Sequence, residues 1–419
     1  MENNKGKIFK KGSKQSGITL VALVVTIVVL LILAGISIRL VLDNNGIITR
    51  AGDAKDKHEK GRANDQTDLN SAEEWINQMS GGNSSRGSLP FGTGTTPYYP
   101  GSDFTQVSGT DLSNGLVIED GNKNQYVWIE VPKTEAVYGE DNLNITEFSD
   151  TELNTIKEKL IAYANDYRES GYADTWYDGC GVSQGKYTTM YNNMLKSVYK
   201  NGGFWIGRYE IGDGDATSTN TGRAYESGTE GAPVIKANMI PYNYITCSQA
   251  EELAETFAPN GYTSSLMFGI QWDLVCKHLE TKGRNPGTKA TSLKDAIKSD
   301  STDWGNYTNA KFTVTNTDAK YSEDDGTSWI TVERSGYSKD LGKKVLLTTG
   351  ATVQNSMMNI YDLAGNLWEW DLEYILAAPG PCSRRGGAYT GSPSGSVSNH
   401  SNYDENTSMD FIGARVAIY

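Results

Sequence analysis

The chain has 419 residues, including 45 Gly, 24 Tyr and 9 Trp, and only 37% of its residues are hydrophobic. This length suffices for one large or two ordinary domains, and the composition is typical of a loop-rich globular protein with aromatic anchors, not of a helical bundle. The formal net charge is −13, and Lys and Arg do not cluster beyond the N-terminal segment, which argues against nucleic acid as a partner.

The N-terminal segment has the charge pattern of a membrane anchor. Several Lys residues precede an uncharged apolar run over residues 18–38, long enough for a helix across a hydrocarbon core of about 30 Å. The positive flank predicts a cytoplasmic N-terminus and an extracellular remainder. A secretory signal is the alternative, but the run is too long for one and no A-x-A cleavage site follows it. We therefore expect a single-pass protein of the cell membrane.

The start of this apolar run carries a family resemblance. KQSG followed by ITLVALVVTIVVLLILAGISI resembles the leader and first helix of type IV prepilins and pseudopilins. The resemblance implies that a prepilin peptidase cuts between Gly17 and Ile18 and methylates the new N-terminus, and that other pilin subunits are partners. Pilins usually carry Glu at the fifth mature residue, where this chain has Ala22. The resemblance therefore favours a minor or tip subunit, or a simple membrane anchor, over a major subunit.

Composition then divides the rest of the chain. Residues 18–79 are predicted to form the transmembrane helix and a charged, solvated stalk helix. Residues 80–103 are rich in Gly, Ser, Thr and Pro, which is typical of a flexible to semi-extended linker. We therefore expect a leader over 1–17, the membrane and stalk helix, the linker, and a domain over 104–419.

Short strands, two helices and long loops predict an α+β fold for this domain. Apolar runs on both sides of Asp120 and Gly121 predict a β-hairpin, and GFWIGRYEI over 203–211 predicts a strand. A T-x-x-Q capping box from Thr246 predicts a short helix, and GIQWDLVCKHL predicts a second one. The inward-facing residues of the second helix are Trp272, Val275, Cys276 and Leu279. Cys276 is interpreted as a small buried hydrophobic residue and not as a reactive thiol.

Three motifs follow in order toward the C-terminus: YDLAGNLWEW (361–370), RGGAY (385–389) and GARV (413–416). They resemble the signatures of the formylglycine-generating enzyme and sulfatase-modifying-factor family, whose fold is an elaborated C-type lectin fold. The resemblance implies that fold for about residues 115–419. Two polar stretches are interpreted as insertions, near residues 145–200 and 283–345.

Roles for the motif residues follow from their types and spacing. Trp368 and Trp370 alternate with Glu369, so on a strand both Trp side chains share one face and the Glu side chain takes the other. Both Trp residues are predicted to be buried. Arg385 and Arg415 each require a carboxylate partner if buried, and Glu369 is a candidate.

Metal and cofactor binding is limited by the residues available. The His and Cys residues show no metal-ligand spacing, so we expect no zinc site; they are His58, His278, His400, Cys180, Cys247, Cys276 and Cys382. The family resemblance implies one cofactor, a calcium ion, held at Gly365, Asn366, Leu367 and Glu369. Oxygen ligands suit this hard cation.

The family's catalytic residues are missing from this sequence. Its oxidase members use a pair of Cys shortly after the RGGSW motif, and RGGAYTGSPSGSVSNHS contains none. Cys382 precedes the motif and has no second Cys near it in the sequence. Iron-dependent relatives need paired His, and His400 stands alone in this part. We therefore predict a domain without enzymatic activity.

Residues 388–411, between the second and third motifs, have the composition of antibody binding loops, in which Tyr supplies contact area and Ser, Gly and Asn adapt their hydrogen bonds. The segment also resembles the variable region of diversity-generating retroelement proteins. We predict a displayed loop that binds a protein or glycan. The candidate contact residues are Tyr389, Ser392, Ser394, Ser396, Ser398, Asn399, His400, Asn402, Tyr403, Asp404 and Asn406. An ordinary surface loop without a ligand is the alternative.

Three functions remain open from the sequence. The favoured hypothesis is a membrane-anchored, pilin-like surface protein whose lectin-fold domain binds a ligand. The second is a structural minor pilin or pseudopilin, of a type IV pilus or a type II secretion system, whose large head caps the filament. The third is an enzyme of the sulfatase-modifying type.

Overall fold

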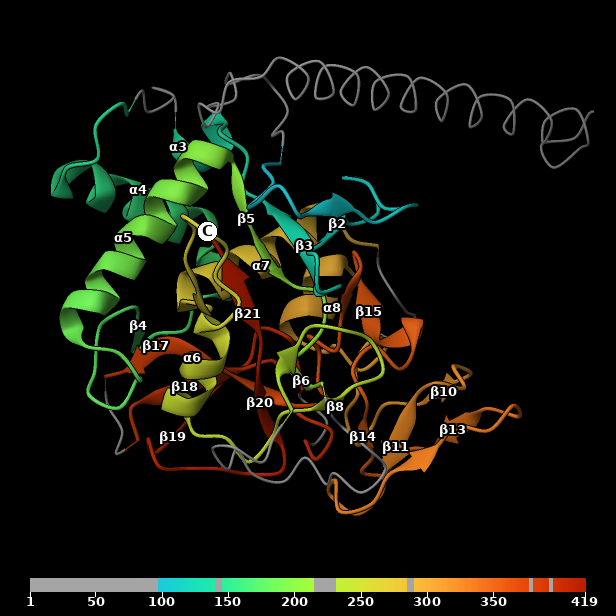
Figure 1. The fold of residues 1–419 in the computed structure, drawn as a ribbon. Helices are drawn as coiled ribbons and strands as arrows, with labels where there is room; N and C mark the ends of the chain where they lie inside the picture. Colours follow the sequence, from blue (N-terminus) through green and yellow to red (C-terminus); the bar gives the residue numbers. More distant parts are fainter. Residues whose placement is uncertain (1–96, 140–144, 215–230, 285–289, 377–379, 392–394) are drawn as a thin grey trace, which may run out of the picture. The chain divides into compact units, whose positions relative to one another are not determined.

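The fold of the C-terminal part is seen in a computed structural model (Figure 1). The structure describes residues 97–139, 145–214, 231–284, 290–376, 380–391 and 395–419, all within the unit Ser88–Tyr419. The predicted leader, the membrane and stalk helix and most of the linker lie outside the described residues, as do four candidate site residues: Gly17, Ile18, Ser392 and Ser394. Within the described ranges, no helix combines the length and apolarity that crossing a membrane requires.

The largest sheet joins segments that are far apart in the sequence, in the order β1-β2-β3-β5-β21-β9, with every neighbouring pair antiparallel. Its strands are β1 (Thr105–Gln106), β2 (Val117–Glu119), β3 (Gln125–Glu130), β5 (Gly203–Gly207), β21 (Val416–Ile418) and β9 (Ser264–Leu266). The predicted hairpin is confirmed as β2 and β3, and the predicted strand as β5. Because β21 lies between β5 and β9, the C-terminal residues are buried in this sheet.

A second sheet carries the three C-terminal motifs. Its order is β19-β18-β17-β20, with β4 paired to β17. Its strands are β4 (Tyr172–Ala173), β17 (Trp368–Ile375), β18 (Cys382–Arg385), β19 (His400–Tyr403) and β20 (Ile412–Ala414). β17 runs antiparallel to β18 and parallel to β20, so the ends of the predicted loop attach to strands on either side of β17.

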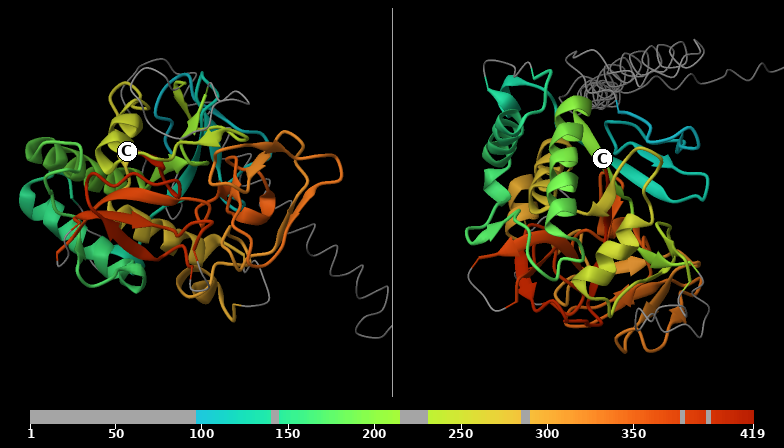
Figure 2. Two further views of the ribbon diagram at one scale, coloured as in Figure 1. Left: turned by 90° about the horizontal axis from the view of Figure 1, so that it is seen from below. Right: turned by 60° about the vertical axis from the view of Figure 1, so that its left-hand side comes forward.

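Helices pack against these sheets, and Figure 2 shows α4 and α5 side by side along one flank. The helices are α3 (Glu135–Tyr138), α4 (Asp150–Tyr163), α5 (Gln184–Asn201), α6 (Cys247–Glu255), α7 (Gly269–Lys282) and α8 (Leu293–Lys298), with the short turns η1 (Asn165–Tyr167) and η2 (Val353–Asn355). Both predicted helices are confirmed, as α6 and α7. The capping box is formed by Thr246 and Gln249, and the inward face of α7, including Cys276, is buried. The chain therefore mixes α and β structure, as predicted.

The interpretation of residues 145–200 as a polar insertion needs correction. This stretch contains α4 and α5, and α5 contributes a buried stripe to the core: Tyr187, Met190, Tyr191, Met194, Leu195, Val198 and Tyr199. Ser183 caps the start of α5 by accepting a hydrogen bond from the backbone of Lys186, and Gly202 ends it in the left-handed conformation. The stretch is therefore part of the core and not an appendage.

The remaining strands form small sheets around the second sheet. β6, β7 and β8 form one; β10 and β13 another; β11, β12 and β14 a third; and β15 and β16 a fourth. Their bounds are β6 (Gly212–Asp213), β7 (Pro233–Val234), β8 (Ile240–Pro241), β10 (Phe312–Val314), β11 (Lys320–Ser322), β12 (Ile330–Thr331), β13 (Tyr337–Lys339), β14 (Leu346–Leu347), β15 (Ser356–Met357) and β16 (Ile360–Tyr361). The sheets of β10 to β14 form a lobe at the lower right of Figure 1. β10 to β13 lie within the second predicted insertion, and β14 follows directly after it.

Candidate ligand-binding site

Arg415, in the last motif, fixes the C-terminal end of the predicted loop. Its guanidinium is fully buried and bound to Glu369, with Nη2 to Oε1 at 2.7 Å and Nε to Oε2 at 3.0 Å. It also donates to the backbone oxygens of Gly207 and Tyr361. The predicted pairing of Arg415 with Glu369 is therefore confirmed. Two parallel charge-assisted hydrogen bonds make this pair a rigid link between β17 and the strand β21 that follows.

Two further buried carboxyl groups, of Glu210 and Asp362, lie in the field of Arg415. Glu210 accepts hydrogen bonds from the backbone of Leu367 at 3.1 Å and the side chain of Asn366 at 2.8 Å. Burial raises the pKa of Glu210 well above its usual range, and it raises the pKa of Asp362 to about 7. One buried cation thus faces three buried acids, which favours protonation of at least one acid near neutral pH.

Asp362→Asn is expected to increase stability at pH 8 and to leave it nearly unchanged at pH 3. The folded pKa of Asp362, about 7, exceeds its usual 3.8. Its contribution to stability is therefore complete below about pH 3.8, falls as the pH rises from there, and is fully lost above about 7. The lost stability is on the order of 2–4 kcal/mol. Asn tolerates the positive φ of 58° at this position. Urea unfolding at both pH values measures the difference, and parallel pH dependence of the two proteins would contradict it.

Arg385, in the second motif, fixes the other end of the loop, but with a different acid from the predicted Glu369. Its Nη2 lies 2.9 Å from Asp273 of α7, and its Nη1 lies 3.5 Å from Glu373 of β17. Arg168 also bonds Asp273, at 3.1 Å. His400 lies 3.2 Å from Glu373 through Nε2, and burial among these groups lowers the pKa of His400 to about 2. His400 is therefore a neutral, buried part of this network and not a contact residue.

Most of the described residues in the first half of the predicted loop are buried, so the prediction of one continuous displayed loop needs correction. Tyr389 is fully buried, and its hydroxyl lies within hydrogen-bond distance of Asp325 and Asp410. Ser396 is fully buried and Ser398 nearly so. They lie beside Val397, whose backbone oxygen accepts the indole N–H of Trp272 at 2.8 Å. Composition did not reveal this burial, because the polar groups here are satisfied by internal hydrogen bonds.

A glycine beside this buried half shows how tightly it packs. Gly387 has φ +83°, and a Cβ there would lie 2.6 Å from the ring of Tyr307. The Tyr307 hydroxyl in turn donates to the backbone oxygen of Gly386 at 2.7 Å. The RGG motif therefore combines an ion-paired Arg with backbone that approaches a buried ring too closely for a larger residue.

The second half of the loop reaches the surface. Asp404 and Asn406 are exposed, and Asn399, Asn402 and Tyr403 are half-buried. Asn402 donates to the backbone oxygen of Gly380 at 2.9 Å, and the backbone of Asn406 donates to Asp404. The structure thus brings these five candidates together along β19 and the turn after it. By contrast, the side chains of four other candidates are buried: Tyr389, Ser396, Ser398 and His400.

Arg384, for which the sequence predicted no role, lies buried beside these residues. Its guanidinium lies over three aromatic rings, at 4.0 Å from the centroid of Tyr403, 4.5 Å from Trp368 and 5.5 Å from Phe411. Its Nη2 donates to the hydroxyl of Ser401 at 3.1 Å. We call these five residues the Arg384 cradle. The sequence did contain a signal for Arg384, which is the pair of adjacent residues Arg384 and Arg385. Side chains of neighbouring residues on a strand point to opposite faces, so the two Arg side chains had to lie in different environments.

The two Trp residues of the GNLWEW motif share a face, as predicted, but differ in burial. Trp370 is 1% exposed, and its indole N–H donates to the backbone oxygen of Ile245 at 2.9 Å. Trp368 is half-buried in the Arg384 cradle. The prediction of a buried core residue is therefore confirmed for Trp370. It is wrong for Trp368, which is the first residue of β17 and is only half-buried.

The residues predicted to hold calcium do not fit that ion as arranged. Both carboxylate oxygens of Glu369 bind Arg415, whose positive charge opposes a second cation. The side-chain oxygen of Asn366 accepts the backbone N–H of Leu347 at 3.0 Å, and its backbone oxygen accepts that of Tyr389 at 2.9 Å. Gly365 and Leu367 lie in the same turn. Within the described ranges, no cluster of three or more His, Cys, Asp or Glu could hold a metal ion.

Cys382 has a neighbouring thiol that the sequence did not reveal. Cys247, at the start of α6, forms a hydrogen bond with Cys382, which together with burial raises the pKa of Cys247 well above its usual range. Burial likewise raises the pKa of Cys180. The four Cys residues are buried and form no disulfide among themselves. Protonated, buried thiols are poor nucleophiles and poor metal ligands.

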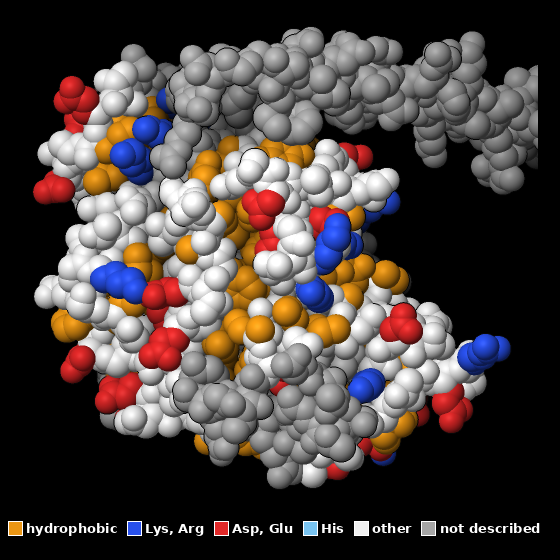
Figure 3. All heavy atoms as spheres, in the orientation of Figure 1, with side chains coloured by type: hydrophobic (Ala, Val, Ile, Leu, Met, Phe, Trp, Pro, Cys, Tyr) orange, Lys and Arg blue, Asp and Glu red, His pale blue; other side chains and the backbone are white. Residues whose placement is uncertain are grey.

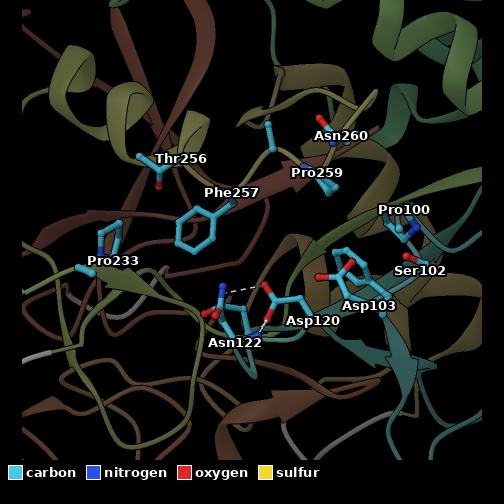
Figure 4. A pocket seen from close by; sticks show the side chains of 15 residues that line it. Pro100, Ser102, Asp103, Asp120, Asn122, Pro233, Thr256, Phe257, Pro259 and Asn260 are labelled. Atoms are coloured by element: carbon cyan, nitrogen blue, oxygen red, sulfur yellow. Dashed lines mark hydrogen bonds between the residues drawn. The ribbon is translucent and has the colours of Figure 1, made fainter.

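A pocket of about 540 Å³ lies apart from the predicted loop, between the β2–β3 turn and the end of α6 (Figure 4). Phe257 and Pro259 face Asp120 and Asn122 across it, and Asp103 lies at its side. Asp120 is used within its own turn, where its side chain accepts a hydrogen bond from the backbone of Asn122 at 2.8 Å.

Apolar side chains gather over the middle of the face seen in Figure 3, with charged side chains of both signs around them.

Comparisons with known proteins give only distant similarity. No family model matches the sequence, and no curated protein matches it. Among solved structures, the chain is similar to Treponema denticola variable protein 1, with 13% identity, 52% of this chain and 84% of that one covered, and a TM-score of 0.28. It is similar to CarF, with 14% identity, 51% and 85% covered, and a TM-score of 0.27. It is also similar to PvdO from Pseudomonas aeruginosa, with 17% identity, 52% and 81% covered, and a TM-score of 0.28. Similarity at this level does not assign a family or a function.

Proposed function

We propose that this protein binds a protein or glycan ligand through residues 399–411 and catalyses no reaction. One observation carries the proposal: polar side chains reach the surface on a segment whose two ends are held by buried ion pairs. Arg385 binds Asp273 on one side, and Arg415 binds Glu369 on the other. Fixed ends reduce the conformational entropy that a binding loop loses when it meets its ligand.

The chemistry of the surface suits recognition. Asn399, Asn402, Asp404 and Asn406 offer donors and acceptors, and the half-buried Tyr403 offers a flat amphipathic face. The absence of catalysis is supported by the state of the thiols and of His400. Burial raises the pKa of the Cys180, Cys247 and Cys276 thiols and lowers the pKa of the His400 imidazole to about 2, so these groups do not suit nucleophilic or acid–base chemistry near neutral pH.

The test replaces the four surface polar residues together with Ala: Asn399, Asn402, Asp404 and Asn406. The full chain and this variant are compared on an array of defined glycans and purified surface proteins. We expect the variant to bind at least tenfold more weakly to any ligand of the wild type. It should stay folded, because Asp404 and Asn406 are exposed and change stability by about 0.5 kcal/mol or less each, while the half-buried Asn399 and Asn402 each lose one hydrogen bond, worth about 1 kcal/mol.

A matched control replaces Asn122 and Asn260, which are exposed residues of the separate pocket, with Ala. This control should bind as the wild type does. Loss of binding in the control together with retention in the loop variant would move the site to the pocket. A loop variant that unfolds would show that the segment is structural and would support the filament-cap function instead.

The finer assignment rests on sequence motifs alone. We propose that residues 18–38 anchor the chain in the membrane after cleavage between Gly17 and Ile18, and that the C-terminal part lies outside the cell, as in a pilin-like protein. We further propose a lectin-type fold with a loop diversified by a retroelement. Mass spectrometry of the mature N-terminus tests the first statement. A reverse-transcriptase gene beside a near-copy of the 3′ coding segment tests the second.

A further inference from the structure

Arg384 differs from the other deeply buried Arg residues because it has no acidic partner among the described residues. Arg415 binds Glu369, and Arg385 binds Asp273. Arg384 is only 6% exposed, and the side-chain hydrogen bonds of its guanidinium go to neutral hydroxyl groups, those of Ser401 and Tyr403. Its Nε and Nη1 atoms are buried and have no hydrogen-bond partner there.

This arrangement is unfavourable in the ligand-free protein. Buried charges in proteins are normally paired, since desolvation of an isolated cation is costly. The aromatic rings of the Arg384 cradle return part of that cost through cation–π attraction. Burial lowers the pKa of Arg384 to about 10. The phenol groups of Tyr403 and Tyr172 raise this pKa, but their effect is smaller than that of burial. The site therefore has unused capacity for a negative charge.

The place of Arg384 connects this capacity to the proposed binding surface. It lies on β18, next to the edge strand β19 that carries Asn402 and Tyr403. Tyr403 is the closest ring, at 4.0 Å, and it is half-exposed. A rotamer change of a half-exposed side chain is fast, so turning of this ring can open the guanidinium to an incoming group.

We propose that Arg384 binds a carboxylate group of the ligand through its unpaired guanidinium N–H groups, with the rings of Tyr403 and Trp368 as walls. A guanidinium fork matches the two oxygens of a carboxylate, and flat walls favour a planar group. The ligand class is therefore an acidic sugar, an acidic side chain or a chain terminus. This inference rests on the proposed function, because it places the carboxylate within the surface of residues 399–411.

The first experiment uses acetate as the probe and the full chain as the protein. Melting is followed in sodium acetate and in sodium chloride at the same pH and ionic strength. We expect acetate to raise the melting temperature of the wild type saturably, to act more weakly on Arg384→Lys, and to have no effect on Arg384→Met. Without acetate, Arg384→Met should melt at or above the wild-type temperature, because it removes an uncompensated charge while keeping an apolar stem. Arg334→Met, at an exposed Arg, is the matched control and should respond as the wild type does.

Two results would overturn the proposal. One is a clearly lower melting temperature for Arg384→Met with the same acetate response as the wild type, which would make Arg384 a structural cation–π residue. The other is stabilisation by sulfate and not by acetate, which would reject a carboxylate as the bound group.

A second measurement separates this inference from the proposed function. N-acetylneuraminic acid, which carries a carboxylate, and N-acetylglucosamine, which does not, are titrated into the wild type, Arg384→Met and the four-residue loop variant. The inference is supported when the acidic sugar alone binds and Arg384→Met weakens it at least tenfold. Equal binding of both sugars, lost only in the loop variant, would refute the role of Arg384 while keeping the proposed function. An acetate response at Arg384 that the loop variant leaves unchanged would support an anion site and contradict its place in the loop surface.

Discussion

Replacing Arg415 with Ala is expected to lower the free energy of unfolding by about 3–5 kcal/mol. The substitution leaves Glu369, Glu210 and Asp362 buried without their shared cation. It also leaves the backbone oxygens of Gly207 and Tyr361 without a donor. A loss of this size exceeds the effect of most single substitutions and is a large part of the total stability of an ordinary domain.

Urea unfolding, followed by Trp fluorescence, measures this loss. Arg334→Ala is the control, since Arg334 is exposed and should change stability by about 0.5 kcal/mol or less. Binding by Arg415→Ala should decline only to the extent that the protein unfolds. A folded Arg415→Ala protein with wild-type stability and lost binding would show that Arg415 contacts the ligand, contrary to its complete burial.

Trp370→Ala is expected to cost about 3–5 kcal/mol, whereas Trp368→Ala should cost about half as much or less. Trp370 is almost completely buried and loses both its packing and the hydrogen bond to Ile245. Trp368 is half-buried, packs against the margin of the core and has the guanidinium of Arg384 at 4.5 Å from its ring centroid. Both substitutions replace a Trp on the same face of β17, so the difference between their losses of stability measures the effect of burial.

Melting of the two Trp variants under identical conditions tests this order. Binding provides an independent readout, because Trp368 borders the proposed ligand surface and Trp370 does not. We expect Trp368→Ala to weaken ligand binding while remaining folded. Equal destabilisation by the two substitutions would mean that Trp368 belongs to the core and would weaken the proposed role of the Arg384 cradle.

Local sequence patterns were sufficient for several elements of the fold. The capping box from Thr246 and the apolar face of α7 predicted two helices, and the runs around Asp120 predicted the β2–β3 hairpin. Such patterns succeed because hydrogen bonding at a helix start and side-chain periodicity act over a few residues. The same reasoning correctly placed Trp368 and Trp370 on one face and Glu369 on the other.

α5 was missed although its sequence contains the signal. Its Tyr, Met and Leu residues recur at helical spacing between a Ser cap and a terminal Gly. Polar residues fill the intervening positions, and their number led to the interpretation as an insertion. The buried stripe becomes visible only when periodicity is counted, not average polarity.

By itself, the sequence determined the α+β class, the main hairpin, helices α6 and α7, the alternation in β17 and the need of buried Arg residues for acids. Only the tertiary structure decided which acid each Arg binds. Arg385 bonds Asp273 across 112 residues of chain, and Arg415 bonds Glu369 across 46. It also buried Tyr389, placed Cys247 beside Cys382 and left Arg384 without an acid among the described residues. These outcomes depend on which distant strands and helices meet, and a residue's type and local spacing do not specify that.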